Sequence, residues 1–474
     1  MRLKQQLKKL QFPFRAKRVS LAPMRIIARI LLCFATFSLA AQPVLAQSVL
    51  RDAETEALLD EMAAPLVEAA GLAPGNVDMV LINDPSINAF VAGGQVVYIH
   101  AGLIDAADTA NEVQGVIAHE LGHITGGHIV RFNEGTSAAS NISILSLILG
   151  VGAALAGAGD AAAGILLAGQ RAALGRFLAF SRVQESAADA AGAQYLSEAG
   201  ISGRGSLAFF GKLYSQGVRY GYDQSEDSEF NRTHPLSQNR IARLREVYEV
   251  DPAWESPNDA ELERKFKRVK AKLFGYLAEP KHTFNAYPAT DNGVPARYAR
   301  AYAYHKSALI DDAMAETDAL LALDPVDPYF LELRGQVLLE SGRPAEALDP
   351  LRRATDLSGN HPLIASIFGH ALIATEDKAN FPEAERVLRT AVGRDRLNPF
   401  AWYQLGVVYA ERGDMPRARL ASAEQQVMTR RYTEALRSAQ FAEAGLEEGT
   451  PDWLRAQDIG LQARAELEKI RARN

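Results

Sequence analysis

Cysteine is almost absent from this sequence of 474 residues. The only cysteine, Cys33, lies near the N-terminus in a short apolar run, ILLCFATFSLAA. The rest of the chain therefore forms no disulfide bond, uses no cysteine nucleophile and holds no metal through thiolates. Any catalytic or metal site in it must be built from histidines, carboxylates and other side chains.

Acidic residues are absent from residues 1–46, which contain nine lysines and arginines. This basic start precedes the apolar run and then the small-residue site Val44-Leu45-Ala46. Such a pattern is typical of a secretory signal peptide. We expect residues 1–46 to be a signal peptide that is cleaved after Ala46 and exports the chain. The alternative is an uncleaved membrane anchor.

An excess of positive charge is also lacking. The chain has 51 Lys and Arg against 57 Asp and Glu, a formal net charge of −6. Without the nine basic residues of the expected signal peptide, 42 basic residues face 57 acidic ones and the net charge is −15. A chain of this charge is poorly suited to sequence-independent binding of nucleic acid. We therefore expect no nucleic-acid partner.

Charged residues are missing again between residues 135 and 159. The length of this segment approaches that of a membrane span, but five glycines and several serines make it only mildly hydrophobic. We expect residues 135–170 to form a mobile amphipathic lid that can touch a membrane surface. The alternative is a membrane-inserted segment.

The first half of the remaining chain has the periodicity of a mostly helical domain with a small sheet. Helical spacing of apolar residues extends over residues 49–70, 109–132 and 176–200. Strand-like runs occupy residues 77–84 and 88–104, and the second run is divided by Gly93-Gly94. Beyond about residue 255 the pattern becomes repetitive.

The repeat has a period near 34 residues. Glycines recur at intervals of 34 and 37, an alanine follows each by 12 or 15 residues, and prolines recur in step. These positions are Gly335, Gly369 and Gly406; Ala347, Ala384 and Ala418; and Pro328, Pro362 and Pro399. Small residues at this period, where paired helices approach closely, are typical of tetratricopeptide repeats. We expect about four helix pairs between residues 290 and 445, followed by a closing helix.

The stretch GVIAHELGHITGGH contains the residues that suggest chemistry. In a helix, His119 and His123 project from one face and can bind a single zinc ion, Zn²⁺. Glu120 would lie beside the open position of the metal, where it can take a proton from water. His128 is a poor third ligand, because five residues rotate it away from His123.

A third protein ligand is needed for a catalytic zinc site. The sequence SRVQESAADAAG places Glu185 and Asp189 four residues apart among alanines, on one face of an expected helix. One carboxylate can ligate the metal and the other can orient a histidine. The alternative is a solvated helix edge.

HELGH, followed by SRVQESAAD and then RTHPLSQNR, resembles the M48 family of zinc metalloproteases over residues 50–250. The resemblance implies an α+β zincin-like (gluzincin) fold, with His119, His123 and Glu185 as zinc ligands. It implies Glu120 as the general base and Asp189 as the partner of a ligand histidine.

The same resemblance assigns roles to residues outside the motif. His234 would lie near the metal and either stabilise the oxyanion or cap the open site in a resting state. Arg240 would orient a neighbouring helix or a carboxylate. Asn88, Ala89 and Phe90 would accept the substrate backbone as an added strand.

The whole chain resembles periplasmic M48 proteases with tetratricopeptide tails that act in beta-barrel assembly. We expect a signal peptide at 1–46, an M48 protease domain at 47–255 and an all-α repeat domain at 256–474. The expected function is a zinc endopeptidase for misfolded or misassembled envelope proteins, with repeats that bind clients or the outer-membrane assembly machinery. The alternatives are a chaperone-like repeat adaptor with a largely latent site and an integral membrane protease.

Overall fold

The computed structural model describes residues 48–128, 145–146, 159–220, 234 and 236–473. The expected signal peptide and most of the expected lid at 135–170 lie outside the described residues. No helix in the described ranges is both long and apolar enough to span a membrane.

A small sheet begins the protease half of the chain. It contains β1 (Ser48–Val49), β2 (Asp78–Asn83), β3 (Ala89–Ala92) and β4 (Val96–His100), in the order β1-β2-β4-β3. β2 and β4 are parallel, whereas β3 and β4 form an antiparallel hairpin that turns at Gly93-Gly94. Phe90 pairs with Tyr98, and their rings stack with centroids 5.0 Å apart. The hairpin leaves β3 at the edge of the sheet.

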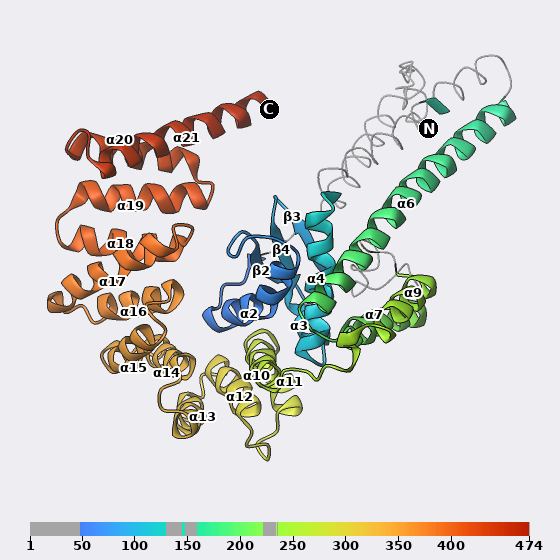
Figure 1. Cartoon of the computed structure of the whole chain (residues 1–474). Coiled ribbons are helices and arrows are strands. Elements are labelled where there is room, and N and C mark those ends of the chain that lie inside the picture. The colour runs from blue at the N-terminus through green and yellow to red at the C-terminus, as the bar shows by residue number, and fades with distance from the viewer. Residues whose placement is uncertain (1–47, 129–144, 147–158, 221–233, 235, 474) are drawn as a thin grey trace, which may run out of the picture. The chain divides into compact units, whose positions relative to one another are not determined.

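Six helices of the described residues pack around the sheet (Figure 1), and one of them, α4, is almost completely buried. They are α2 (Ala53–Ala69), α3 (Ala101–Ala106), α4 (Ala110–Thr125), α6 (Gly159–Glu198), α7 (Arg204–Tyr220) and α9 (Gln238–Glu249). The buried one is α4, in which every residue from Ala110 to His123 is buried. The Thr109 side chain caps it by accepting a hydrogen bond from the Glu112 amide. The predicted combination of a small sheet with mostly helical structure is thus confirmed.

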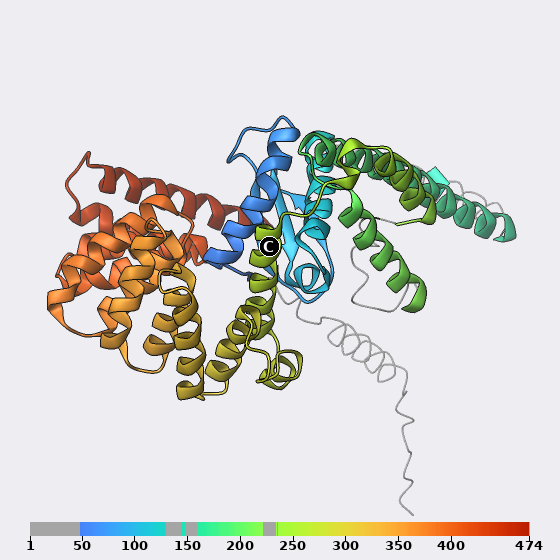
Figure 2. The ribbon, with the colours of Figure 1, turned by 60° about the horizontal axis from the view of Figure 1, so that its bottom comes forward.

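Two glycines allow α4 and α6 to cross at very short range. A Cβ atom on Gly122 of α4 would lie 2.6 Å from the carbonyl oxygen of Ala188 in α6. Reciprocally, a Cβ atom on Gly192 of α6 would lie 3.0 Å from the backbone of Ala118. Figures 1 and 2 show α6 as one long helix that passes α4 near its C-terminal end and extends well beyond it.

The linking helix α10 (Ala260–Leu277) follows a short 3₁₀ turn, η2 (Pro252–Glu255). Phe266 and Val269 of α10 are part of the same hydrophobic core as α4. α10 also packs against α12 (Val294–Lys306), with α11 (Pro280–Ala286) between them in sequence. The domain boundary at residue 255 stays a prediction.

Paired antiparallel helices make up the rest of the chain. They are α12 with α13 (Ile310–Leu323), α14 (Pro328–Glu340) with α15 (Pro344–Leu357), α16 (Pro362–Ala374) with α17 (Phe381–Arg394), and α18 (Pro399–Glu411) with α19 (Met415–Met428), followed by α20 (Tyr432–Gly445) and the closing helix α21 (Pro451–Arg473). The predicted repeat array is confirmed. The three additional residues of the third pair form a 3₁₀ turn, η3 (Lys378–Asn380).

The periodic small residues lie where the paired helices touch. A Cβ on Gly335 would meet Leu351 at 2.4 Å, and a Cβ on Gly369 would meet Leu388 at 2.5 Å. Ala347 and Ala384 are fully buried. The spacing read from the sequence therefore reflects one packing contact repeated from pair to pair.

We expect Gly122→Ala to lower stability, because its methyl group collides with the backbone of α6 and overpacked sites lose about 1–3 kcal/mol. Gly211→Ala in α7 is the matched control, because a Cβ there meets nothing within 4 Å. That change should hold or raise stability, since alanine is favoured over glycine inside helices by about 1 kcal/mol. Calorimetric unfolding of both variants checks the expectation, and equal melting temperatures would contradict it.

Candidate metal centre

Four buried side chains converge beside the crossing of α4 and α6. They are His119 and His123 of α4, Glu185 of α6, and His234, which precedes α9. One ligand atom from each lies within 4.8 Å of all the others. The Nε2 atoms of the two α4 histidines are 3.2 Å apart.

The donor atoms of these residues face a common point. The Glu185 carboxylate lies 3.4 Å from His119 Nε2 and 3.5 Å from His123 Nε2. His234 Nδ1 lies 3.1 Å from a Glu185 oxygen and 3.4 Å from His119 Nε2. Imidazole nitrogens with a carboxylate oxygen form a donor set that suits a divalent transition metal.

Glu120 adds a second feature that fits such a centre. Its side chain is fully buried, and neither carboxylate oxygen accepts a hydrogen bond from the residues that the structure describes. Nε2 of His234 lies 3.6 Å from a Glu120 oxygen. A buried carboxylate of this kind is costly unless it has a partner, and a water at the centre would provide one.

The second ring nitrogen, Nδ1, of each α4 histidine also has a neighbour. His119 Nδ1 lies 3.1 Å from Asp189, and His123 Nδ1 lies 2.8 Å from Nδ1 of His128. Nδ1 of each ring faces these neighbours, and Nε2 of each ring faces the common point. Partners of this type fix the orientation and tautomer of ligand histidines.

Arg240 at the start of α9 binds both acidic residues of α6. Its guanidinium donates two hydrogen bonds of 2.8 Å to Asp189 and lies 3.0 Å from Glu185. All three side chains are buried. A bidentate guanidinium fixes the positions of carboxylates more tightly than a lysine would.

The carboxylates make this pocket favourable for a cation. Burial alone would lower the pKa of His119, but Asp189 and Glu185 outweigh it and raise that pKa to about 10. Burial tends to raise the pKa of Glu185, yet the neighbouring His234 and His119 hold it well below its usual range. For Glu120, burial raises the pKa of the carboxyl.

The residues expected to bind substrate lie at the sheet. Ala89 and Phe90 belong to the edge strand β3, and Asn88 is a buried residue just before it. The Asn88 carbonyl accepts a hydrogen bond from the His100 amide. The role of these three residues stays a prediction.

Three contributions to the site were missed by sequence reasoning. Gly122 and Gly192 permit the helix crossing, and Phe210 of α7 places its ring edge-on to His119 with centroids 5.7 Å apart. A glycine inside a strongly helical segment is the signal that could have indicated the crossing. Phe210 carries no comparable signal.

Sequence comparison is consistent with this geometry. Residues 49–248 match the profile of peptidase family M48, and residues 298–362 and 375–427 match that of the tetratricopeptide repeat. The chain thus contains a peptidase family M48 domain followed by tetratricopeptide repeats. The M48 domain hydrolyses peptide bonds, and the donor set of its centre suits the metal on which M48 metalloproteases depend.

Two relatives align with this chain over more than the M48 domain, and a third aligns over a shorter part. The beta-barrel assembly-enhancing protease of Escherichia coli (strain K12) is 26% identical over 75% of this chain and 72% of its own length. The protein of the same name from Yersinia pestis is 23% identical over 78% of this chain and 75% of its own. A putative beta-barrel assembly-enhancing protease of Vibrio cholerae is 31% identical over 42% of this chain and 40% of its own.

Removing the charge of Asp189 should weaken metal binding without removing a ligand. We expect Asp189→Asn to lower metal affinity by about 10–100-fold, the usual effect of losing a partner of a ligand histidine. Competition with a chromophoric chelator measures the dissociation constant. Asp349→Asn, on the exposed face of α15, is the control. Equal affinities of the Asp189 variant and the wild type would contradict the positioning role.

Proposed function

We propose that this metalloprotease is a zinc endopeptidase that is exported and acts on proteins of the outer-membrane assembly route. The observation that carries the proposal is the buried convergence of His119, His123 and Glu185 beside Glu120. Two imidazoles and one carboxylate form a typical zinc ligand set. The assembly role rests on the relatives that share both the M48 domain and the repeats.

Within this proposal His119, His123 and Glu185 hold one zinc ion per chain. When bound, zinc acts as a Lewis acid that lowers the pKa of water and polarises a peptide carbonyl. Glu120 accepts the proton of the attacking water and transfers it to the leaving amine nitrogen. Its raised pKa suits this exchange, because a carboxyl that binds a proton more tightly is a stronger base. Asp189, Arg240 and His128 hold the ligands in orientation.

His234 has two candidate roles, and its contacts favour the cap. Its Nδ1 atom lies within the ligand group, close to Glu185 and His119, and contributes to a four-residue set. A site with four protein ligands is closed, whereas a catalytic zinc needs an open position. We infer that His234 occupies the fourth position in a resting state and leaves it when substrate binds.

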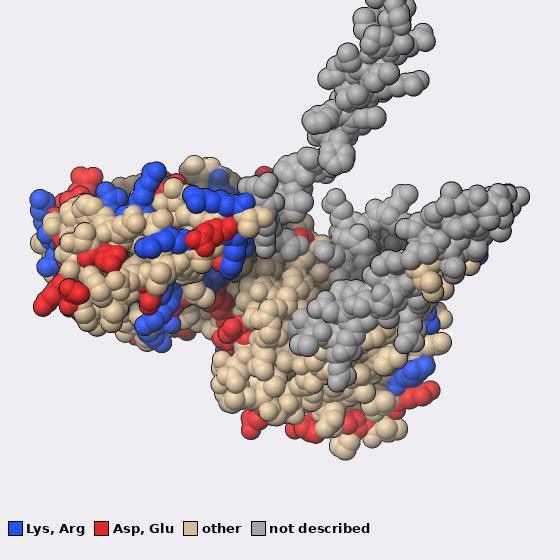
Figure 3. Space-filling view, turned by 90° about the horizontal axis from the view of Figure 1, so that it is seen from above, with Lys and Arg blue, Asp and Glu red and all other residues tan. Residues whose placement is uncertain are grey.

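The repeats provide the client or partner contacts in this proposal. Tetratricopeptide arrays present extended surfaces that commonly bind peptide segments. Figure 3 shows Lys and Arg intermixed with Asp and Glu over the repeat array, with no area of a single sign on this face. Such a surface favours local recognition of side chains over long-range attraction of a highly charged partner.

The chaperone-like adaptor remains the second candidate, because a capped centre would also be expected of a mainly latent protease. In that case the repeats would rescue clients without cleavage. The variant Glu120→Gln, which should bind metal but lacks the general base, distinguishes a protease from an adaptor.

Metal content and cleavage test the enzyme directly. We expect about one zinc per purified wild-type chain and less than a tenth of that in His119→Ala, because a ligand is lost. Glu120→Gln should keep its zinc but cleave an unfolded protein at least about 100-fold more slowly, since general base catalysis is removed. Retained cleavage by Glu120→Gln would refute the assigned base. Full rescue of outer-membrane assembly by that variant would favour the adaptor.

Removing the imidazole of His234 distinguishes its two roles. If His234 caps the centre, His234→Ala should raise the rate of peptide cleavage, because the fourth position is then open to substrate. If it stabilises the oxyanion, the same change should lower kcat by about 10²–10³-fold. We expect the increase, measured as initial rates on a quenched fluorescent peptide at matched zinc content.

A further inference from the structure

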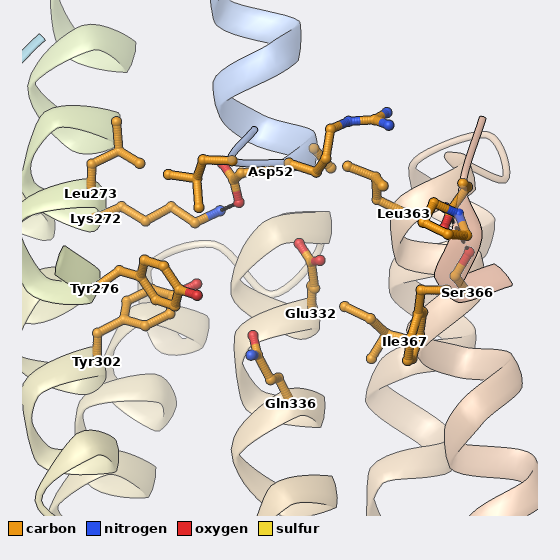
Figure 4. A pocket seen from close by; sticks show the side chains of 16 residues that line it. Asp52, Lys272, Leu273, Tyr276, Tyr302, Glu332, Gln336, Leu363, Ser366 and Ile367 are labelled. Carbon is orange, nitrogen blue, oxygen red and sulfur yellow. Dashed lines mark hydrogen bonds and ion pairs between the residues drawn. The ribbon is translucent and has the colours of Figure 1, made fainter. Parts of the chain in front are cut away.

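A separate cavity of about 320 Å³ lies between the start of the protease half and the repeats. It is lined by the segment before α2, by α10 and by the first helices of four repeat pairs, α12, α14, α16 and α18. Figure 4 shows side chains from these elements pointing into one space around Glu332 of α14.

Glu332 is the unusual group in this cavity. Its side chain is only 7% exposed, and it has no hydrogen bond or ion pair with any residue in the described part of the chain. Figure 4 shows the carboxylate of Glu332 pointing into the cavity, toward the side where Asp52 and Lys272 lie. A buried carboxylate without a partner is unfavourable, and burial raises the pKa of Glu332 to about 8.

The fixed cations nearby are already paired with other acids. Lys272 lies 2.5 Å from Asp52 and 3.2 Å from Glu54. Arg268 binds Glu54 and Asp327. Arg51 and Lys272 line the cavity, but each is paired with other acids, so Glu332 has no ion pair among the residues that the structure describes. An ammonium group that entered the cavity would favour the ionised form of Glu332.

Apolar side chains in the lining are suited to an alkyl chain, although polar residues such as Gln336 and Asn398 also line the cavity. Leu273, Tyr276 and Tyr302 approach from one side of Glu332 and Ile367 from the other (Figure 4). A lysine side chain combines an apolar stem of four carbons with a compact ammonium group. An arginine has a shorter apolar stem and a larger, planar head group.

The surroundings of the cavity favour a polypeptide over a small free amine. Phe400 of α18 lines the cavity and is 41% exposed, and Tyr403, one turn further, is 57% exposed. Two exposed aromatic side chains on the same face of a helix can contact the residues that flank a bound lysine. A free polyamine would leave them unused.

We propose that this cavity binds the side chain of a lysine in an extended client polypeptide, with Glu332 as the partner of the ammonium group. The inference rests on the client-binding role proposed for the repeats and names the side chain that they recognise. It places one recognition site where the N-terminal segment of the protease half meets the repeats.

Binding is measured with the full chain carrying Glu120→Gln, so that the probe is not cleaved. Two fluorescent peptides of equal length differ only at the central residue, which is lysine in one and norleucine in the other. We expect the lysine peptide to bind about 10-fold more tightly, as for a buried charge-assisted hydrogen bond. Fluorescence anisotropy gives both dissociation constants.

Glu332→Gln keeps the shape of the side chain and removes its charge. It should weaken binding of the lysine peptide about 10-fold and leave the norleucine peptide unchanged. Glu346→Gln, at an exposed position of α15, makes the same change in net charge and should alter neither constant. Ile367→Lys is a second variant, which supplies a tethered ammonium group and should also abolish the preference for lysine.

Equal preference for lysine in the wild type and in both cavity variants would overturn the proposal. Displacement of the lysine peptide by spermidine, at concentrations below the dissociation constant of the peptide, would overturn the assignment to a polypeptide. Cleavage of a lysine-free peptide is measured separately in chains that retain Glu120. If the wild type did not cleave this peptide, the protease proposal would be refuted, whereas the binding result would still stand.

Discussion

The contact on which the metal centre depends is the close crossing of α4 and α6. Gly122 and Gly192 remove the side chains that would separate the two helices. At this separation, Glu185 can reach the pair of imidazoles presented by α4. A helix pair held at the usual distance of 8–10 Å by larger side chains would leave the carboxylate too remote. The ligand set therefore depends on the close packing of the two helix backbones as well as on the ligand side chains.

Local spacing was enough to predict much of this architecture. The interval between His119 and His123 indicates one helix face, and the recurrence of Gly335 and Gly369 indicates the helix pairs, because both depend on neighbours in sequence. The crossing of α4 and α6 depends on Gly122 and Gly192, which are 70 residues apart in sequence and whose approach no periodicity specifies. The roles of His119, His123 and Glu120 came from the spacing of the motif, those of the other site residues came from or were completed by family resemblance, and all of them stay predictions.

Arg240 illustrates a second limit of sequence reasoning. The motif around it indicated that it orients a helix or a carboxylate, and the structure places its guanidinium against both Asp189 and Glu185. Which acids an arginine binds depends on the angle at which α9 meets α6, and that angle is a property of the assembled core. The buried cavity around Glu332 was beyond prediction for the same reason, since its lining comes from six separate segments.

Helix α10 contributes Phe266 and Val269 to the hydrophobic core of the protease half and also packs against α12 of the repeats. The packed core of the protease half therefore extends beyond residue 248, where the match to family M48 ends. A gene fusion that exchanged the repeats at residue 256 would remove α10, and with it part of the hydrophobic core that packs around α4. During evolution, a new tail could be grafted without harm only downstream of this helix.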